Sequence, residues 1–188
     1  MRKIGWILLV SILLLTGCGG EPNFPKAEGD PSPERQEEQT APETGEERIP
    51  GTWTVPEGWT KAEAYSTENK VFYVETGHED DELPDNISIE VGTNQYSQGE
   101  HEAFRDAIVR QLAMQLRGVE AEATGDGSFT EQDYILYTFT IRTEDHATIQ
   151  YYIVGEKRYC LIHLTIFSGS ESPETAARAL VDSFVWSE

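Results

Sequence analysis

Runs of alternating apolar and polar residues predict several β-strands after the first fifty residues. Residues 86–91 and 134–142 alternate with the period of two that gathers apolar side chains on one face of a strand. Residues 147–154 and 158–167 carry apolar side chains on both faces, which is typical of central strands covered on two sides. The intervening Gly155-Glu156 predicts a hairpin, and shorter strands are expected at 52–55 and 71–74.

Two segments have the spacing of amphipathic helices instead. Residues 98–117 carry an apolar side chain at every fourth position, and the pair Ser97 and Glu100 has the spacing of a capping box. Gly118 is typical of the residue that follows a helix C-terminus. Residues 172–184 begin with a Ser-Pro-Glu sequence that favours a helix N-terminus and then carry a second apolar stripe.

These elements predict one α+β domain over residues 51–188, in which an antiparallel β-sheet packs against a long helix and a C-terminal helix. Gly125-Asp126-Gly127-Ser128 has the glycines of a phosphate-binding loop. It lacks the Gly-Lys-Ser/Thr ending and does not precede a helix, so we expect a turn there. Phe129 is expected to begin the next strand.

The first residues form a different pattern. Arg2-Lys3 precede an apolar run from Ile4 to Leu15, which is well short of the ~20 residues that cross a bilayer. The run ends in Leu15-Thr16-Gly17-Cys18, which resembles the lipobox of a bacterial lipoprotein signal peptide. The resemblance implies that residues 1–17 are removed and that the sulfur of Cys18 receives a diacylglyceryl group. An ordinary secretory signal and a membrane helix are the alternatives.

Such an anchor would hold the mature chain at the extracytoplasmic face of the cell membrane, because two acyl chains bind stably where one binds reversibly. Residues 18–50 follow the lipobox and are rich in Glu, Pro, Gly and Gln, with few large apolar side chains. A segment of this composition cannot bury enough apolar surface to offset its ordering entropy, which predicts a disordered linker.

The charge balance narrows the classes of partner. The chain has 34 Asp and Glu against 14 Lys and Arg, for a formal net charge of −20. Nothing in it offers the basic footprint that binds nucleic acid, and anionic lipid headgroups would repel the domain.

Of the two cysteines, Cys18 is assigned to the lipid, which leaves Cys160 without a disulfide partner. Cys160 lies in an apolar strand-like run, so we expect a buried thiol.

The segment from His78 to Asp85 is the best candidate for site chemistry. Its carboxylates are the hard oxygen ligands that suit calcium, but the spacing of a calcium loop is absent and a solvated acidic loop is the alternative. The histidines show no paired metal-ligand spacing. We therefore expect no metal or cofactor site. The histidines are His78, His101, His146 and His163.

Several aromatic side chains on the expected strands allow two interpretations. They either line a ligand groove or, as is more common at strand spacing, pack in the core and in cross-strand pairs. These residues are Tyr134, Tyr137, Tyr151, Tyr152, Tyr159 and Phe167.

Three segments resemble the PsbP-like fold, which includes many small bacterial lipoproteins such as the DcrB-like group. They are Trp53–Trp59 as an opening strand and turn, the helix at 98–117, and Ala176–Phe184 as a closing helix. Over residues 51–187 this resemblance implies an α/β/α sandwich. Members of the fold are mostly non-enzymatic binding or assembly factors, which implies a binding role toward an unknown extracytoplasmic protein or small ligand.

An exported hydrolase is the alternative from another class. It would use a pair of carboxylates that face each other across a cleft. The candidates are Asp80, Asp81, Glu90 and Asp133.

Overall fold

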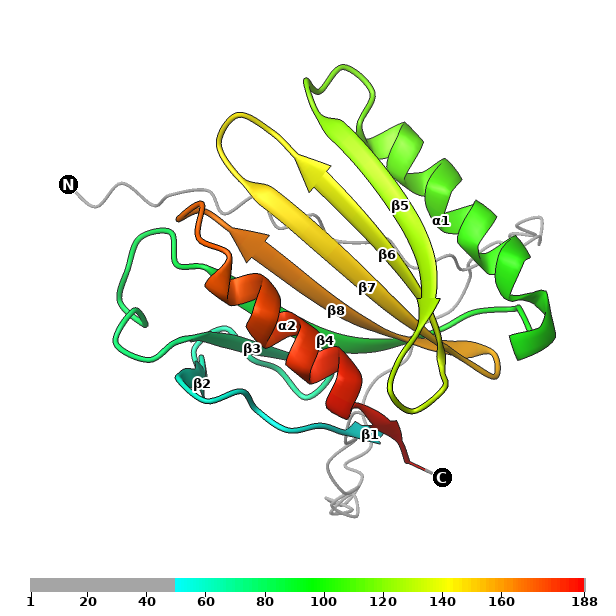
Figure 1. The fold of residues 1–188 in the computed structure, drawn as a ribbon, viewed down its shortest axis with the longest axis horizontal. Helices are drawn as coiled ribbons and strands as arrows, with labels where there is room; N and C mark the ends of the chain where they lie inside the picture. Colours follow the sequence, from blue (N-terminus) through cyan, green and yellow to red (C-terminus); the bar gives the residue numbers. More distant parts are fainter. Residues whose placement is uncertain (1–49, 188) are drawn as a thin grey trace, which may run out of the picture.

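The computed structural model describes residues 50–187, and Figure 1 shows their arrangement. The strands of the main sheet are β2 (Trp59–Lys61), β3 (Lys70–Glu75), β4 (Asn86–Thr93), β5 (Glu122–Phe129), β6 (Ile135–Arg142), β7 (Ala147–Gly155) and β8 (Arg158–Ile166). A short 3-10 turn, η1 (Gln98–Glu100), leads into α1 (His101–Gln115), and α2 (Ser172–Ser183) follows β8. Two short strands, β1 (Gly51–Thr52) and β9 (Val185–Trp186), pair with each other near the two ends of this region.

Within these described residues the main sheet has seven strands in the order β2-β3-β4-β8-β7-β6-β5, and every neighbouring pair is antiparallel. The expected α+β class, with a large antiparallel sheet and two helices, is confirmed. The strands with apolar residues on both faces, β7 and β8, lie inside the sheet, as their pattern predicts.

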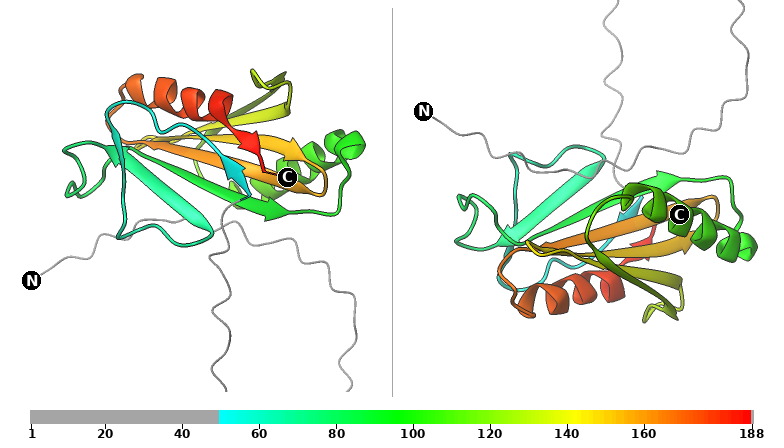
Figure 2. Two further views of the ribbon diagram at one scale, coloured as in Figure 1. Left: turned by 90° about the horizontal axis from the view of Figure 1, so that it is seen from below. Right: turned by 90° about the horizontal axis from the view of Figure 1, so that it is seen from above.

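The two helices cover opposite faces of the sheet (Figure 2). One core lies under α2, where Ala177, Leu180 and Phe184 are fully buried against residues of β4, β7 and β8. The other lies under α1, where Phe104 and Ile108 pack against aromatic and aliphatic residues of β6, β7 and β8. The sheet is therefore the middle layer of an α/β/α sandwich.

The α1 helix follows the sequence prediction with small shifts. Its first turn is η1, and the Ser97 backbone N–H donates a hydrogen bond to Glu100 Oε2 at 3.0 Å, as a capping box requires. This bond also holds the pKa of the Glu100 carboxyl below its ordinary value. The helix ends at Gln115, and Gly118 takes a φ of +77° in the turn that follows.

The sequence prediction lacks the short strands β2 and β9 and, more importantly, the long strand β5. Gly125–Ser128 does not form a turn, and Phe129 ends a strand instead of beginning one: both belong to β5, an eight-residue edge strand that pairs with β6. Glycine and aspartate are depleted in strands, so the low strand propensity of these residues favours a turn over the strand that they form. Two aromatic rings of β6 lie over the glycines and replace the packing that larger β5 side chains would provide.

The opening strand is also shorter than expected. The predicted strand at 52–55 keeps only Thr52, because Trp53 leaves the β1–β9 pair. The Trp53 indole Nε1 donates a hydrogen bond to the Tyr73 hydroxyl at 2.9 Å, and the Trp53 ring stacks on Phe184 with centroids 6.5 Å apart. At Trp53, side-chain contacts with the core therefore take the place of backbone pairing with β9.

The predicted signal peptide (1–17), the candidate lipidation residue Cys18 and nearly all of the predicted linker (18–50) lie outside the described residues. No helix among residues 50–187 is long and apolar enough to cross a membrane.

Candidate functional site

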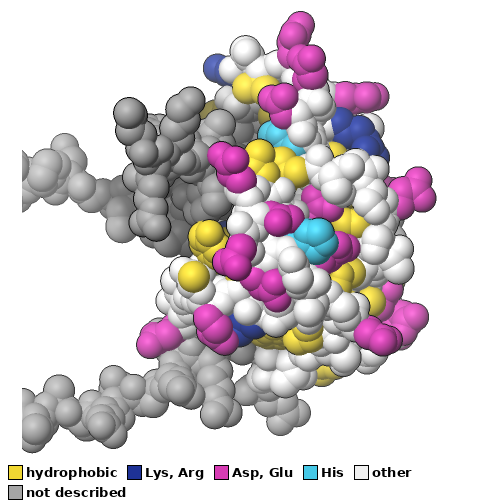
Figure 3. Space-filling view, turned by 90° about the vertical axis from the view of Figure 1, so that its left-hand side faces the viewer, with side chains coloured by type: hydrophobic (Ala, Val, Ile, Leu, Met, Phe, Trp, Pro, Cys, Tyr) yellow, Lys and Arg dark blue, Asp and Glu magenta, His cyan; other side chains and the backbone are white. Residues whose placement is uncertain are grey.

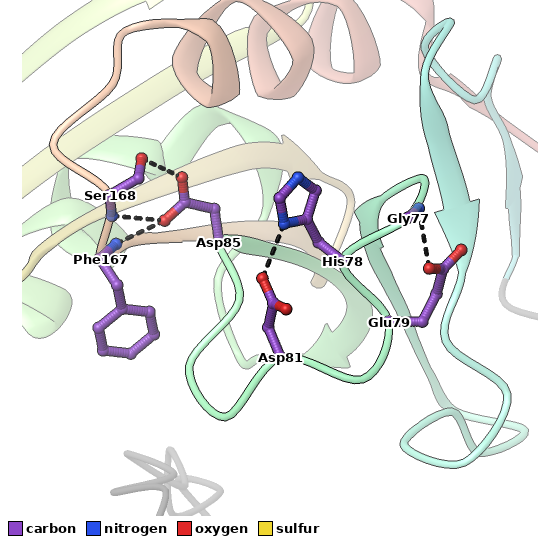
Figure 4. Close-up of polar contacts among 7 residues, drawn as sticks. All are labelled: Gly77, His78, Glu79, Asp81, Asp85, Phe167 and Ser168. Atoms are coloured by element: carbon purple, nitrogen blue, oxygen red, sulfur yellow. Dashed lines mark hydrogen bonds and ion pairs between the residues drawn. The ribbon is translucent and has the colours of Figure 1, made fainter.

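The carboxylates of the acidic loop make local hydrogen bonds (Figure 4). His78 Nδ1 and Asp81 Oδ2 are 2.7 Å apart, and the Gly77 backbone N–H donates to Glu79 Oε2 at 2.8 Å. The hydrogen bond to Asp81 raises the pKa of His78 above its ordinary value. These contacts hold the turn between β3 and β4, and they occupy oxygens that a bound cation would need.

Asp85, at the end of the same loop, fastens it to the segment between β8 and α2. Its Oδ1 accepts hydrogen bonds from the backbone N–H groups of Phe167 at 2.6 Å and Ser168 at 2.9 Å, and the Ser168 hydroxyl donates to its Oδ2. The residues around Ser168 form the loop before α2. Asp85 thus has a structural role in joining two loops.

The structure does not gather these groups into a metal site. Over residues 50–187, no three His, Cys, Asp or Glu side chains lie where they could hold one ion. Figure 3 faces the end of the molecule that carries the β3–β4 loop and shows acidic side chains spread over its visible surface. The four histidines are likewise distributed over separate elements.

The carboxylates of the hydrolase alternative lie on different elements. Asp80 and Asp81 are in the β3–β4 loop, and Asp133 is in the β5–β6 turn at the opposite edge of the sheet. Glu90 lies within β4 and forms an ion pair with Lys70 Nζ at 3.0 Å. Apart from Asp80 and Asp81, which share a loop, these acids therefore have different structural settings.

Cys160 is fully buried in β8, which confirms the sequence prediction of a buried thiol. Burial raises its pKa far above the ordinary thiol value, so the neutral, unreactive form predominates. Of the aromatic residues considered for a groove, Tyr151, Tyr152 and Tyr159 are buried in the two cores. Tyr137 is different, because it also lines a cavity.

That cavity is a groove of about 510 Å³ between α1 and β5, which run side by side in Figure 1. One wall is the outer flank of α1 and the other is β5. The floor is formed by apolar side chains of β6. The principal residues are Val109, Ala113 and Leu116 of α1, Ala123 to Gly127 of β5, and Tyr137, Phe139 and Ile141 of β6.

The groove exists because β5 has almost no side chains on this side. Ala123, Gly125 and Gly127 alternate along the strand and face α1, so nothing larger than a methyl group projects between them and the helix. A Cβ atom at Gly125 would lie 2.9 Å from Cδ1 of Phe139, and one at Gly127 would lie 3.2 Å from Cε1 of Tyr137. Larger residues would therefore push against the aromatic floor.

A small polar cluster borders the groove, with Arg105 and Tyr137 among its lining residues. His101 Nδ1 and the Tyr137 hydroxyl are 2.7 Å apart, and the Arg105 guanidinium lies over the Tyr137 ring at 5.9 Å from its centroid. Burial raises the pKa of Tyr137, so its hydroxyl stays protonated at neutral pH. The arrangement is suited to binding an apolar group beside a polar one.

Sequence reasoning missed the groove because it missed β5. The signal was present as small residues at every second position, Ala123, Gly125 and Gly127, beside the regular apolar stripe of α1. The glycines were interpreted as a turn, so the strand that forms one wall did not exist in the prediction.

No protein-family model matches this chain, and no curated protein matches it. Solved structures that are similar to it include the following three. LpqN from Mycobacterium tuberculosis, described as involved in cell envelope biogenesis, gives a TM-score of 0.50 at 13% identity over 73% of this chain and 83% of LpqN.

The second is cyanobacterial PsbP from Synechocystis, with a TM-score of 0.45 at 11% identity over 73% of this chain and 87% of that one. The third is a protein from Bacteroides thetaiotaomicron, with a TM-score of 0.42 at 13% identity over 74% of this chain and 46% of that one. Similarity at these identities concerns the fold alone, and at that level LpqN, with its TM-score of 0.50, agrees with the α+β fold expected from the sequence.

The histidine on β8 provides a prediction for stability. His163 is half-buried, and burial lowers the pKa of its imidazole to about 4, with the positive charges of Lys70 and His146 acting in the same direction. The unfolded chain takes up this proton near pH 6.5, so the folded state loses stability as the pH falls from 6.5 to 4. We expect His163→Gln to weaken this loss by roughly 2 kcal/mol between pH 7 and pH 4.5 in urea unfolding.

His78→Gln is the matched control. Because Asp81 raises the pKa of His78, removing this imidazole changes the pH dependence in the opposite direction. Identical pH profiles for wild type and His163→Gln would show that the His163 ring is protonated as easily in the folded chain as in the unfolded one.

Proposed function

We propose that this chain is a lipid-anchored extracytoplasmic protein whose α+β domain binds a partner without catalysing a reaction. The proposal of binding rests on the groove between α1 and β5, because its lining combines an apolar floor with the polar groups of Arg105 and Tyr137. The proposal of a lipid anchor rests on the lipobox-like segment Leu15–Cys18. An anchored domain searches only a thin layer next to the membrane, which raises its effective concentration toward partners there.

Two further observations are consistent with this function. The fold is shared with LpqN, which is involved in cell envelope biogenesis. Of the carboxylates considered for a hydrolase, Asp133 lies on a different element from Asp80 and Asp81 in the described structure, and Glu90 is already paired with Lys70.

The anchor is tested by the chemistry of Cys18. In cells grown with an alkyne-bearing fatty acid, we expect the wild-type chain to take up the label and Cys18→Ser to lose it completely. Intact-mass measurement should show a wild-type chain that begins at Cys18 and carries the diacylglyceryl group. Label uptake is the better readout, because an uncleaved leader could itself hold the precursor in the membrane.

Cys160→Ser is the control for loss of a thiol. Since Cys160 is fully buried in β8, this variant should keep the full fatty-acid label at Cys18. An unlabelled wild-type chain, or a mature chain that still begins at Met1, would refute the anchor.

A further inference from the structure

Among the described residues no strand pairs with the outer edge of β5, which presents a row of backbone groups. β5 is the last strand in the sheet order, and all eight of its residues are exposed. The Gly127 N–H donates to Oδ1 of the neighbouring Asp126 at 2.8 Å, whereas the Thr130 N–H donates to the β6-side carbonyl of Tyr134 at 3.0 Å. Because amide directions alternate along a strand, the odd-numbered residues of β5 direct their N–H and C=O groups away from β6.

The same residues face the groove. Ala123, Gly125 and Gly127 have outward-directed backbone groups and also the small side chains that leave space beside α1. An extended segment paired with this edge would extend the sheet by one strand. Every second side chain of that segment would enter the space over Val109 and Leu116 of α1, and the others would point to the opposite face of the sheet.

The charges on that opposite face determine which side chains a bound segment can carry there. Glu122, Thr124, Asp126 and Ser128 occupy it on β5. From Gly118 to Ile141 the chain contains five acidic residues and no Lys or Arg. A basic side chain directly opposite Glu122 or Asp126 forms a favourable cross-strand pair, whereas an acidic one is repelled.

We propose that β5 and the α1 groove bind an extended segment of another protein in which apolar and basic residues alternate, by addition of a strand to the sheet edge. This inference rests on the proposed binding function and names its ligand class. A second copy of the chain does not fit, because its own β5 edge carries the same acidic residues. The segment 19–49 does not fit either, since it contains nine acidic and three basic residues.

The test uses the full chain in mild detergent and a fluorescent eight-residue peptide of alternating lysine and valine. We expect saturable binding by fluorescence anisotropy. We also expect slower hydrogen exchange at the outward amides of β5, which strand pairing protects. Two matched peptides separate the contributions. One alternates glutamate with valine, and the other keeps lysine and valine but carries N-methyl groups on the backbone amides that would pair.

Variants of the edge provide the second arm. Ala123→Pro removes one outward N–H on an edge where proline is tolerated, and we expect about fivefold weaker binding than for Ala123→Ser, which keeps it. Asp126→Asn removes one charge and retains an oxygen acceptor for the Gly127 N–H, and we expect about two- to fivefold weaker binding. Melting temperatures of all variants verify that the domain is folded.

Three outcomes overturn the proposal: equal binding of the N-methylated peptide, equal binding of the glutamate peptide, or no binding with a folded domain. Concentration-dependent dimerisation that protects the same amides would also overturn it in favour of a second copy. None of these results affects fatty-acid labelling at Cys18, so failure of the peptide site and failure of the anchor are separately visible.

Discussion

Phe184→Ala should destabilise the domain by about 3–5 kcal/mol and lower its melting temperature by on the order of 10–20 °C. Phe184 is fully buried at the end of α2. Its ring stacks on Trp53 and meets Trp186 edge to face with centroids 4.9 Å apart. Truncation would remove both aromatic contacts and leave a cavity between β1, α2 and β9. Differential scanning calorimetry with urea unfolding measures the loss.

The neighbouring Val185 provides the control. Its side chain is 40% exposed, so Val185→Ala should change stability by less than about 0.5 kcal/mol. If Phe184→Ala were as mild as this control, the packing of the C-terminal end against Trp53 described above would be wrong.

Phe104→Ala should have a comparable effect on the opposite face, with a loss of about 3–5 kcal/mol. Phe104 is 1% exposed in α1, and its ring contacts Tyr96, Tyr152 and Tyr159 with centroids 5.4–6.2 Å apart. It is the main aromatic contact between α1 and the sheet. We therefore expect chemical denaturation at a lower urea concentration, and faster proteolysis within α1 under native conditions.

Val109→Ala, one turn further along α1, separates stability from binding. Val109 is 46% exposed and lines the groove instead of the core. We expect a stability change below about 0.5 kcal/mol but weaker binding of the lysine–valine peptide. A large loss of stability in Val109→Ala would mean that the groove is closed and that α1 packs directly on β5.

The sequence predicts the central part of this fold well and its edges poorly. The strands β7 and β8 have long apolar runs because both of their faces are covered, and α2 has a clear apolar stripe, so each is recognisable from local pattern alone. Cys160 was correctly assigned to the core for the same reason. In these elements the buried positions are the apolar ones, so the pattern of apolar residues along the sequence indicates which positions are buried.

The strand β5 was missed because its stability comes from another strand. Gly125 and Gly127 have low strand propensity, and the rings of Phe139 and Tyr137 that cover them come from β6. That contact depends on register, which a local pattern does not contain. The groove was missed with it, although Tyr137 was among the aromatic residues considered for one.

In the acidic loop, by contrast, a feature that is prominent in the sequence does not form a site in the structure. The cluster of acids from Glu79 to Asp85 was prominent in the sequence, but the structure uses Asp85 to fasten two loops and pairs Asp81 with His78. A dense set of carboxylates in a sequence gives no information about whether their oxygens converge. Chain geometry decides this, through the hydrogen bonds that each oxygen makes.

The pairing of β1 with β9 has a practical consequence for engineering. Gly51 and Trp186 are directly opposite each other, so the two ends of the domain are adjacent. A short loop could join them, and new ends could be opened at the exposed Glu156-Lys157 turn without changing the order of strands in the sheet. Because the Arg158 guanidinium lies over the Trp186 ring at 4.4 Å from its centroid, the new ends would emerge beside the old ones, and a tethered permutant would present its groove in much the same orientation.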